Sequence, residues 1–276
     1  MRRTSGSVVC PRCGRLVGVT EPRCANCGAW QPGMFGYGPG VQRWLGRLDL
    51  PNLITLACAA LYVASLALDP AALLRVRDLF DILAPSPGAL DALGMTGGYA
   101  LAQGRWWTVF TAVFLHGSLL HILFNMVIMR RYLAIVADLY GAARAWVIFM
   151  VAGAAGFVLS DIASGAPTIG ASGSIFGVFA ALIVYGRRSG QAQATQQMWL
   201  TALVMFAFGF FYPSVNNWAH AGGFAGGFVA AEAMGFAHQR TGPAVLVPAG
   251  LLLLAVVGGF GLEIARVALA LTGHGG

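Results

Sequence analysis

Residues 170–177 read Gly-Ala-Ser-Gly-Ser-Ile-Phe-Gly, a glycine- and serine-rich entry into an apolar segment. A second polar stretch, Asn-Trp-Ala-His-Ala-Gly-Gly at residues 217–223, opens another apolar segment later in the chain. A serine and a histidine that each begin an apolar helix fit a nucleophile and its general base inside a membrane. They equally fit two polar residues in a glycine-rich helix packing. The rest of the sequence has to decide between these interpretations.

The composition is that of a membrane protein. Hydrophobic residues make up 58% of the chain and charged residues 10%, with a mean hydropathy of +0.72, whereas a soluble domain carries about 25% charged residues. The formal net charge is +7, and all 17 basic residues are arginines that lie between apolar segments. This distribution indicates membrane topology and contact with lipid headgroups, and it disfavours nucleic acid as a partner.

Four cysteines near the start form two C-x-x-C pairs, each followed by glycine: Cys10 with Cys13, and Cys24 with Cys27. Two such pairs bring four thiolates onto one tetrahedral Zn²⁺. The alternative, a pair of redox disulfides, is disfavoured by a cytosolic location. We therefore predict a zinc ribbon over residues 1–30, folded by its metal and available to a cytosolic partner. A linker rich in glycine and proline follows over residues 31–49.

Seven apolar segments are candidate membrane spans: 51–68, 118–139, 143–162, 171–186, 197–212, 217–237 and 244–265. No cleavable signal peptide is expected before them, so the first span would direct insertion. The fourth offers about 14 helical residues, or ~21 Å, against a hydrocarbon core of ~30 Å. Ser172 would then be recessed in the membrane, which requires burial in protein or a water-filled cavity.

Arginines fix the predicted orientation. They are concentrated before the first span and in the connections on that same side, which places the N-terminus in the cytoplasm and the C-terminus outside. Spans two, four and six then all run inward from the outer face. His116, His121 and Asn125 begin span two, Ser172 begins span four and His220 begins span six. All five groups are therefore expected at a similar depth, as one shared site requires.

The polar groups suit acyl-transfer chemistry. His121 and Asn125 lie four residues apart on one helix face, where imidazole and amide donors can stabilise an oxyanion. Hydrogen bonding between helices is the alternative role for such residues. Nothing in the sequence places Asp161, near the end of span three, against His220, so a Ser-His dyad is preferred. Phe176, one turn after Ser172, is expected to hold the His220 ring by stacking.

Glycines at small-xxx-small spacing are expected to let spans four and six nearly touch. The pairs are Gly173 with Gly177, Gly222 with Gly226, and Gly223 with Gly227. Close packing would then serve catalysis, because Ser172 and His220 must approach to hydrogen-bond distance. At the end of span seven, Glu263 and Arg266 have the spacing of a local ion pair.

Three ordered motifs resemble those of the rhomboid intramembrane serine proteases, over about residues 50–240. They are Phe-Leu-His-Gly-Ser-Leu-Leu-His-Ile-Leu-Phe-Asn-Met at 114–126, Gly-Ala-Ser-Gly at 170–173, and Ala-His-Ala-Gly-Gly-Phe-Ala-Gly-Gly at 219–227. The resemblance implies Ser172 as nucleophile and His220 as general base. It implies an oxyanion hole from His121, Asn125 and the Ser172 backbone N–H, approached by the loop that contains Gly170. His116 takes a structural or hydrogen-bonding role.

The fold that this resemblance implies is an all-α polytopic membrane protein. A six-helix rhomboid-like core would occupy residues 50–240 and an additional transmembrane helix with a tail residues 241–276. The family's upstream Trp-Arg pair reads Trp107-Thr108 here, with Arg105 nearby. Residues 206–212 and 213–217 look like a gate and a cap.

The implied function is intramembrane serine endopeptidase activity near the outer leaflet of a bacterial inner membrane, without a catalytic cofactor. The partners are the lipid bilayer and transmembrane protein substrates. One alternative is an inactive rhomboid-like protein that binds membrane clients, although such proteins usually lack the serine or the histidine. A transporter is disfavoured, because the chain shows neither internal repeats nor ionisable groups at mid-bilayer.

Overall fold

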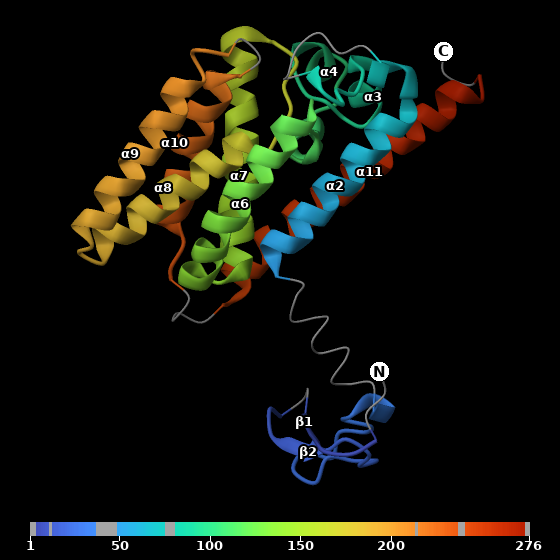
Figure 1. The fold of residues 1–276 in the computed structure, drawn as a ribbon, viewed down its shortest axis with the longest axis vertical. Helices are drawn as coiled ribbons and strands as arrows, with labels where there is room; N and C mark the ends of the chain where they lie inside the picture. Colours follow the sequence, from blue (N-terminus) through green and yellow to red (C-terminus); the bar gives the residue numbers. More distant parts are fainter. Residues whose placement is uncertain are drawn as a thin grey trace. The chain divides into compact units, whose positions relative to one another are not determined.

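The computed structural model describes residues 4–10, 13–36, 49–74, 81–212, 215–236 and 241–273, and Figure 1 shows its elements. The chain divides into two compact units, Met1–Asn52 and Leu53–Gly276. The first contains a small two-stranded sheet and the second is helical.

The N-terminal unit is built on a hairpin of β1 (Ser7–Val9) and β2 (Leu16–Gly18), which pair antiparallel with Val8 opposite Val17. Its small core consists of Val8, Cys10, Val17, Val19 and Cys24. The packed unit continues beyond residue 30, where the sequence analysis starts the linker. The Trp30 and Phe35 rings meet edge to face at 5.6 Å. Most of the expected linker, residues 37–48, lies outside the described residues.

All seven predicted apolar segments are helical in the described residues. They form α2 (Leu50–Leu68), α6 (Leu119–Tyr140), α7 (Ala142–Ser164), α8 (Ser172–Arg188), α9 (Ala192–Phe208), α10 (Asn217–Ala233) and α11 (Pro243–Leu271). The loop region between α2 and α6 carries the short helices α3 (Pro87–Ala92), α4 (Gly98–Ala102) and α5 (Thr108–Thr111). Single turns of 3-10 helix are η1 (Met34–Gly36), η2 (Pro70–Leu74) and η4 (Ala112–Phe114).

Four of these helices are long and apolar enough to cross a membrane, namely α2, α6, α7 and α11. The other three, α8, α9 and α10, have 17 residues each, or about 26 Å at 1.5 Å per residue. A bilayer crossing takes about 20 residues. The expectation of a short fourth span therefore extends to the fifth and sixth, and the fourth is itself about three residues longer than the sequence indicated.

The centre of the helical unit is formed by α7, α8 and α10, each of which packs against the other two. Around this trio, α6 packs on α7 and α8, α9 packs on α8, and α11 packs on α7 and α5 (Figure 1). Most of α8 is buried, including the Phe179 and Ile183 side chains. A helix enclosed by protein does not face lipid, so its length is not set by the thickness of the hydrocarbon.

The starts of α8 and α10 lie at the same end of the unit. Thr96, in the loop between α3 and α4, forms an isolated antiparallel bridge with Thr168, just before α8. At the opposite end, Arg188 of α8 is ion-paired with Glu232 of α10. Helices α8 and α10 therefore run in the same direction, and the residues that begin them are brought to one level.

Candidate functional site

Ser172 and His220 meet between α8 and α10. Ser172 is the first residue of α8 and is partly exposed, whereas His220 lies in the first turn of α10 and is 6% exposed. Their Oγ and Nε2 atoms are 2.9 Å apart, although the two residues are 48 positions apart in sequence. That distance is a hydrogen bond. The structure thus brings together the serine and histidine that the sequence analysis pairs.

Two neighbours hold the His220 ring. Phe176 stacks on it, with ring centroids 4.3 Å apart and an interplanar angle of 19°. On the other ring nitrogen, Nδ1 lies 3.3 Å from Asn217 Oδ1. In the tautomer protonated on Nδ1, the imidazole donates to Asn217 and Nε2 accepts the Ser172 hydroxyl proton. An amide oxygen therefore occupies the position that a carboxylate holds in a Ser-His-Asp triad.

The short Ser172–His220 distance depends on backbone-to-backbone contact between α8 and α10. A Cβ atom on Gly223 would lie 2.6 Å from the Gly173 carbonyl carbon, and one on Gly227 would lie 2.7 Å from the Gly177 carbonyl oxygen. Real Cβ atoms essentially never approach other heavy atoms below 3.0 Å. Close packing of these two glycine pairs was predicted, and the structure confirms it.

The third predicted glycine pair, Gly222 with Gly226, packs against α7 instead of α8. A Cβ on Gly222 would lie 2.7 Å from the Ala155 carbonyl oxygen, and one on Gly226 would lie 2.5 Å from Ala155 Cβ, both on α7. The prediction that this pair draws α10 to α8 is therefore wrong. The physical reason is that consecutive glycines on a helix face directions about 100° apart, so Gly222 and Gly223 serve different neighbours.

His121 and Asn125 lie on one face of α6, as their spacing predicts. Asn125 is buried and its Nδ2 donates to the His121 carbonyl oxygen at 2.8 Å, which leaves the second N–H of the amide available. Gly170 has a φ of +113°, and a Cβ there would lie 2.7 Å from His121 Nε2. Glycine is required at this position both by the backbone conformation and by the approach of the imidazole.

The start of α6 fixes the orientation of His121. Ser118 is the N-cap, and its Oγ accepts from the His121 backbone N–H at 3.3 Å. The Gly117 backbone N–H donates to His121 Nδ1, also at 3.3 Å. His116 is fully buried, and its ring packs edge-on against the His121 ring with centroids 5.0 Å apart. The structure therefore gives His116 a packing contact with His121.

A polar network that the sequence analysis missed joins the loop before α8 to the start of α10. Asn216 Nδ2 donates to Ser160 Oγ at 2.6 Å and to Thr168 Oγ1 at 3.0 Å, and these two hydroxyls are 3.2 Å apart. Asn216 is also the N-cap of α10, where its Oδ1 accepts from the Ala219 N–H. The Asn-Asn pair preceding an apolar helix was a capping signal, but its tertiary partners leave no local trace.

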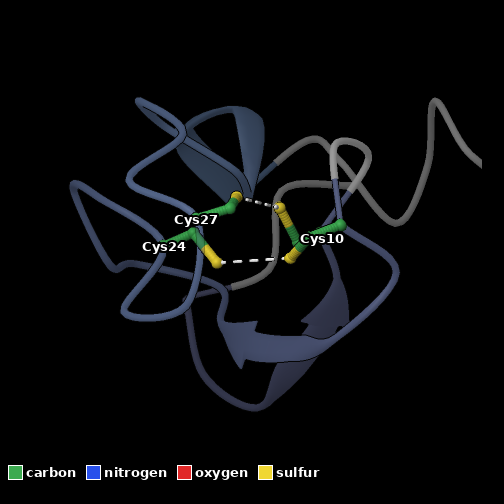
Figure 2. Close-up of side chains that lie close together, drawn as sticks. Cys10, Cys24 and Cys27 are labelled. Atoms are coloured by element: carbon green, nitrogen blue, oxygen red, sulfur yellow. Dashed lines mark hydrogen bonds between the residues drawn. The ribbon is translucent and has the colours of Figure 1, made fainter.

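In the N-terminal unit, the four predicted cysteines converge. Their Sγ atoms all lie within 4.8 Å of one another, and Cys10–Cys27 and Cys13–Cys24 are each 3.7 Å apart (Figure 2). Four sulfurs about 2.3 Å from one Zn²⁺ in tetrahedral geometry are about 3.8 Å from each other. All five cysteines of the chain are free, so the cluster is not a pair of disulfides. The four thiols fit a metal ion.

The backbone forms the same turn at both cysteine pairs. Gly14 N–H donates to Cys10 O and Gly28 N–H to Cys24 O, each at 2.9 Å, and both glycines have φ near +70°. The resulting turns aim backbone N–H groups at sulfur, as in the bond that Cys13 receives from Arg15. That bond, together with the Asn26 side chain, lowers the pKa of Cys13 to about 6. Stabilised thiolate is the form that binds a metal ion.

Comparisons with known proteins agree with the motifs. The Rhomboid domain family matches residues 103–235. The chain is 32% identical over 172 residues to the rhomboid protease GluP of Bacillus subtilis (strain 168), which covers 61% of this chain and 34% of the relative. It is 29% identical over 155 residues to RHOMBOID-like protein 7 of Arabidopsis thaliana, covering 54% and 49%.

The shorter protein YdcA of the same Bacillus strain, also named for this family, is 30% identical over 139 residues. That alignment covers 48% of this chain and 70% of YdcA, whereas the chain spans only a third to a half of the length of GluP and of RHOMBOID-like protein 7. The matched region contains the helices that carry Ser172 and His220, and neither the cysteine cluster nor α11 falls within residues 103–235. The chain is a member of the rhomboid family.

Proposed function

We propose that this protein is an intramembrane serine endopeptidase that cleaves transmembrane segments of other membrane proteins. The observation that carries the proposal is the 2.9 Å contact between Ser172 Oγ and His220 Nε2 at the start of two parallel, closely packed helices. A hydrogen bond between two packed helices would account for the Ser172–His220 pair, but it would not account for the further N–H donors near this pair. Family membership and the names of relatives such as GluP support the same reaction.

The two residues divide the chemistry as nucleophile and base. His220 Nε2 takes the hydroxyl proton as Ser172 Oγ attacks the substrate carbonyl, which forms an acyl-enzyme when the protonated histidine returns that proton to the leaving amine. Water, deprotonated by the same nitrogen, then releases the acyl group. Phe176 and Asn217 act as positioning residues, because they fix the plane and the tautomer of the imidazole. No metal or cofactor takes part in these steps.

The oxyanion is assigned to the space beside Gly170. The Ser172 backbone N–H begins α8 and has no partner within that helix, as is true of every helix start. The His121 ring is adjacent to Gly170, and the free N–H of Asn125 lies one turn further along α6. In this proposal three donors from two helices serve the one oxyanion. Loss of one such donor commonly costs about 10²–10³-fold in rate.

Substrate access is assigned to the side of α9. This helix packs on α8, and of its residues only Ala202 is buried. Its aromatic end continues to the site, because Phe206 lies 6.3 Å from Phe176 and 5.5 Å from Phe210, which is 72% exposed. A substrate helix would enter between α6 and α9, with residues 206–212 as the gate. Pro213 and Ser214 of the expected cap lie outside the described residues.

The membrane arrangement follows from the arginines. We assign a six-helix core to residues 50–240, an additional helix to residues 241–276, the N-terminus to the cytoplasm and the C-terminus to the outer side of a bacterial inner membrane. Ser172 and His220 then face the outer leaflet. Because α8 has only 17 residues, it is shorter than a full bilayer crossing. In this proposal the space between Ser172 and the outer face of the membrane holds the water that hydrolysis needs.

The four-cysteine cluster is assigned as a structural zinc site of the cytoplasmic ribbon. Cys10, Cys13, Cys24 and Cys27 would hold the ion, which supplies folding free energy to a unit too small for a sufficient core. The site contributes nothing to peptide cleavage in this proposal. Its folded surface is available to a cytosolic partner.

The proposal is tested with purified full-length protein in liposomes and a model single-span substrate. Ser172→Ala and His220→Ala are expected to abolish cleavage, whereas Ser174→Ala is the matched control. Ser174 is fully buried two residues away, in the same motif, so its loss changes packing but not the nucleophile. Cleavage that survives in Ser172→Ala would overturn the assignment. Absence of cleavage by the wild type, with substrate bound, would favour the client-binding alternative.

A further inference from the structure

A buried charged cluster joins α11 to the loop region between α2 and α6. Glu263 of α11 is 1% exposed, and its carboxylate accepts four N–H bonds. Arg105 donates from Nε at 3.0 Å and from Nη2 at 2.9 Å, Trp107 Nε1 donates at 2.9 Å, and Arg266 Nε donates at 2.8 Å. Asp91 completes the cluster, 2.7 Å from Arg105 and 3.2 Å from Arg266.

The cluster is balanced in charge and almost fully bonded. Two arginines face two carboxylates, and the fork of Arg105 engages both Glu263 oxygens. Burial of a carboxylate is costly unless its lone pairs are satisfied, and here they are. The predicted local pair of Glu263 with Arg266 is confirmed. The other partners of Glu263 lie more than 150 residues away in sequence, and the sequence analysis gave no sign of them.

From this cluster a chain of contacts leads to the proposed catalytic loop. Trp107 is the N-cap residue of α5, and α5 runs directly into η4. Ala112 is the first residue of η4, and its carbonyl oxygen accepts a hydrogen bond from the Gly170 N–H at 2.9 Å. Gly170 in turn lies against the His121 ring, two residues before Ser172. The position of α5 and η4 therefore fixes the loop that carries the nucleophile and its backbone N–H oxyanion donor.

A second contact ties α11 to the same segment. A Cβ on Gly259 would lie 2.9 Å from Thr111 Cγ2 and 3.3 Å from Trp107 Cδ1, so the α11 backbone packs directly on α5. Thr111 is itself anchored, because its Oγ1 donates to the Gly94 carbonyl oxygen at 2.8 Å. The α5 segment is thus held from one side by α11 and from the other by the loop after α3.

We propose that Glu263 is a positioning residue for peptide cleavage. It holds Arg105 and Trp107 in place and thereby fixes α5 and η4. The Ala112 carbonyl oxygen of η4 in turn binds the Gly170 N–H and so positions the loop that leads to Ser172. The inference rests on the proposed protease function. It gives α11, which lies outside the family match at residues 103–235, a defined part in activity. A cluster that merely stabilised the fold would leave the geometry of the Ser172 loop unchanged in any variant that still folds.

The test compares full-length Glu263→Gln with Glu232→Gln in liposomes. The control removes the same charge from the exposed Arg188 pair at the opposite end of the helices. Glu263→Gln is expected to lower kcat about tenfold or more with little change in KM, to slow fluorophosphonate labelling of Ser172 by the same factor, and to speed amide hydrogen exchange in the peptide covering residues 165–172. Glu232→Gln should match the wild type in all three.

The possible results distinguish a failure of the Glu263 proposal from a failure of the proposed protease function. Unchanged kcat, labelling and exchange in folded Glu263→Gln would overturn the positioning role, even if the melting temperature fell. If Glu263→Gln does not fold, Trp107→Phe serves instead, because it removes a single N–H bond to Glu263 and is expected to slow labelling about threefold; unchanged labelling would contradict the proposal. A wild type without Ser172-dependent labelling would refute the protease function, while the exchange measurement would still test the link from Glu263 to the loop.

Discussion

Substitution of Gly223 by alanine tests the idea that backbone contact between α8 and α10 sets the catalytic distance. The new Cβ would lie 2.6 Å from the Gly173 carbonyl carbon, whereas ordinary contacts begin near 3.4 Å. The Gly173 carbonyl oxygen lies closer still, so the helices must separate by at least about 0.8 Å at this point, which lengthens the Ser172–His220 contact from 2.9 Å to about 3.7 Å or more. That is beyond a hydrogen bond. A misplacement of this size is expected to lower kcat about 10²-fold.

The overpacking itself should cost about 1–3 kcal/mol of stability, so activity must be measured well below the melting temperature. The assay is cleavage of a single-span substrate together with the rate of fluorophosphonate labelling, both in liposomes. Gly258→Ala is the matched control, because Gly258 also lies within a helix but has nothing within 4 Å of its added Cβ. The reasoning is refuted if folded Gly223→Ala labels and cleaves within about threefold of the Gly258→Ala protein.

Three further changes probe the surroundings of the site and the ribbon. Asn217→Ala removes the 3.3 Å contact to His220 Nδ1, and the loss of about 1 kcal/mol should reduce kcat about fivefold with KM unchanged, as initial rates will show. Phe176→Leu keeps an apolar side chain but removes the ring stacked on His220, and a several-fold slower labelling rate is expected; an unchanged rate would remove Phe176 from the positioning residues. Cys24→Ser should abolish stoichiometric zinc by elemental analysis and unfold the ribbon, yet leave cleavage by the core intact; full zinc content in this variant would contradict the four-cysteine site.

The sequence was sufficient to predict the helices and the main pairing of the site. Lipid leaves the backbone few alternatives to helix, so apolar runs such as the one beginning at Leu119 translate directly into structure. Alternating direction then placed Ser172 and His220 at one level, and the glycine spacing of Gly173 and Gly223 indicated close contact. These inferences needed only the spacing of apolar residues and glycines, the lengths of the apolar segments and the positions of the arginines.

What escaped prediction depends on contacts between distant segments. Asn216 bridges Ser160 and Thr168, and Glu263 binds Arg105, but neither pair leaves a periodic signal in the sequence. The orientation of Gly222 toward α7 follows from three-helix packing and not from spacing alone. In the ribbon, residues 31–35 were expected in a linker because of Pro32 and Gly33, yet Gly33 lies against Val19, just after β2, and the Phe35 ring contacts Trp30. Glycine-proline composition marks turns, and turns also close folded units.

The central claim is that Ser172 is a nucleophile activated by His220, and the covalent adduct of a fluorophosphonate tests it most directly. Peptide mass spectrometry of the labelled wild type should locate a single phosphonyl group on Ser172, and His220→Ala should show essentially none under the same conditions. Ser174 lies in the same peptide and provides an internal comparison. A phosphonyl group on another residue, or equal labelling of Ser172 without His220, would contradict the account.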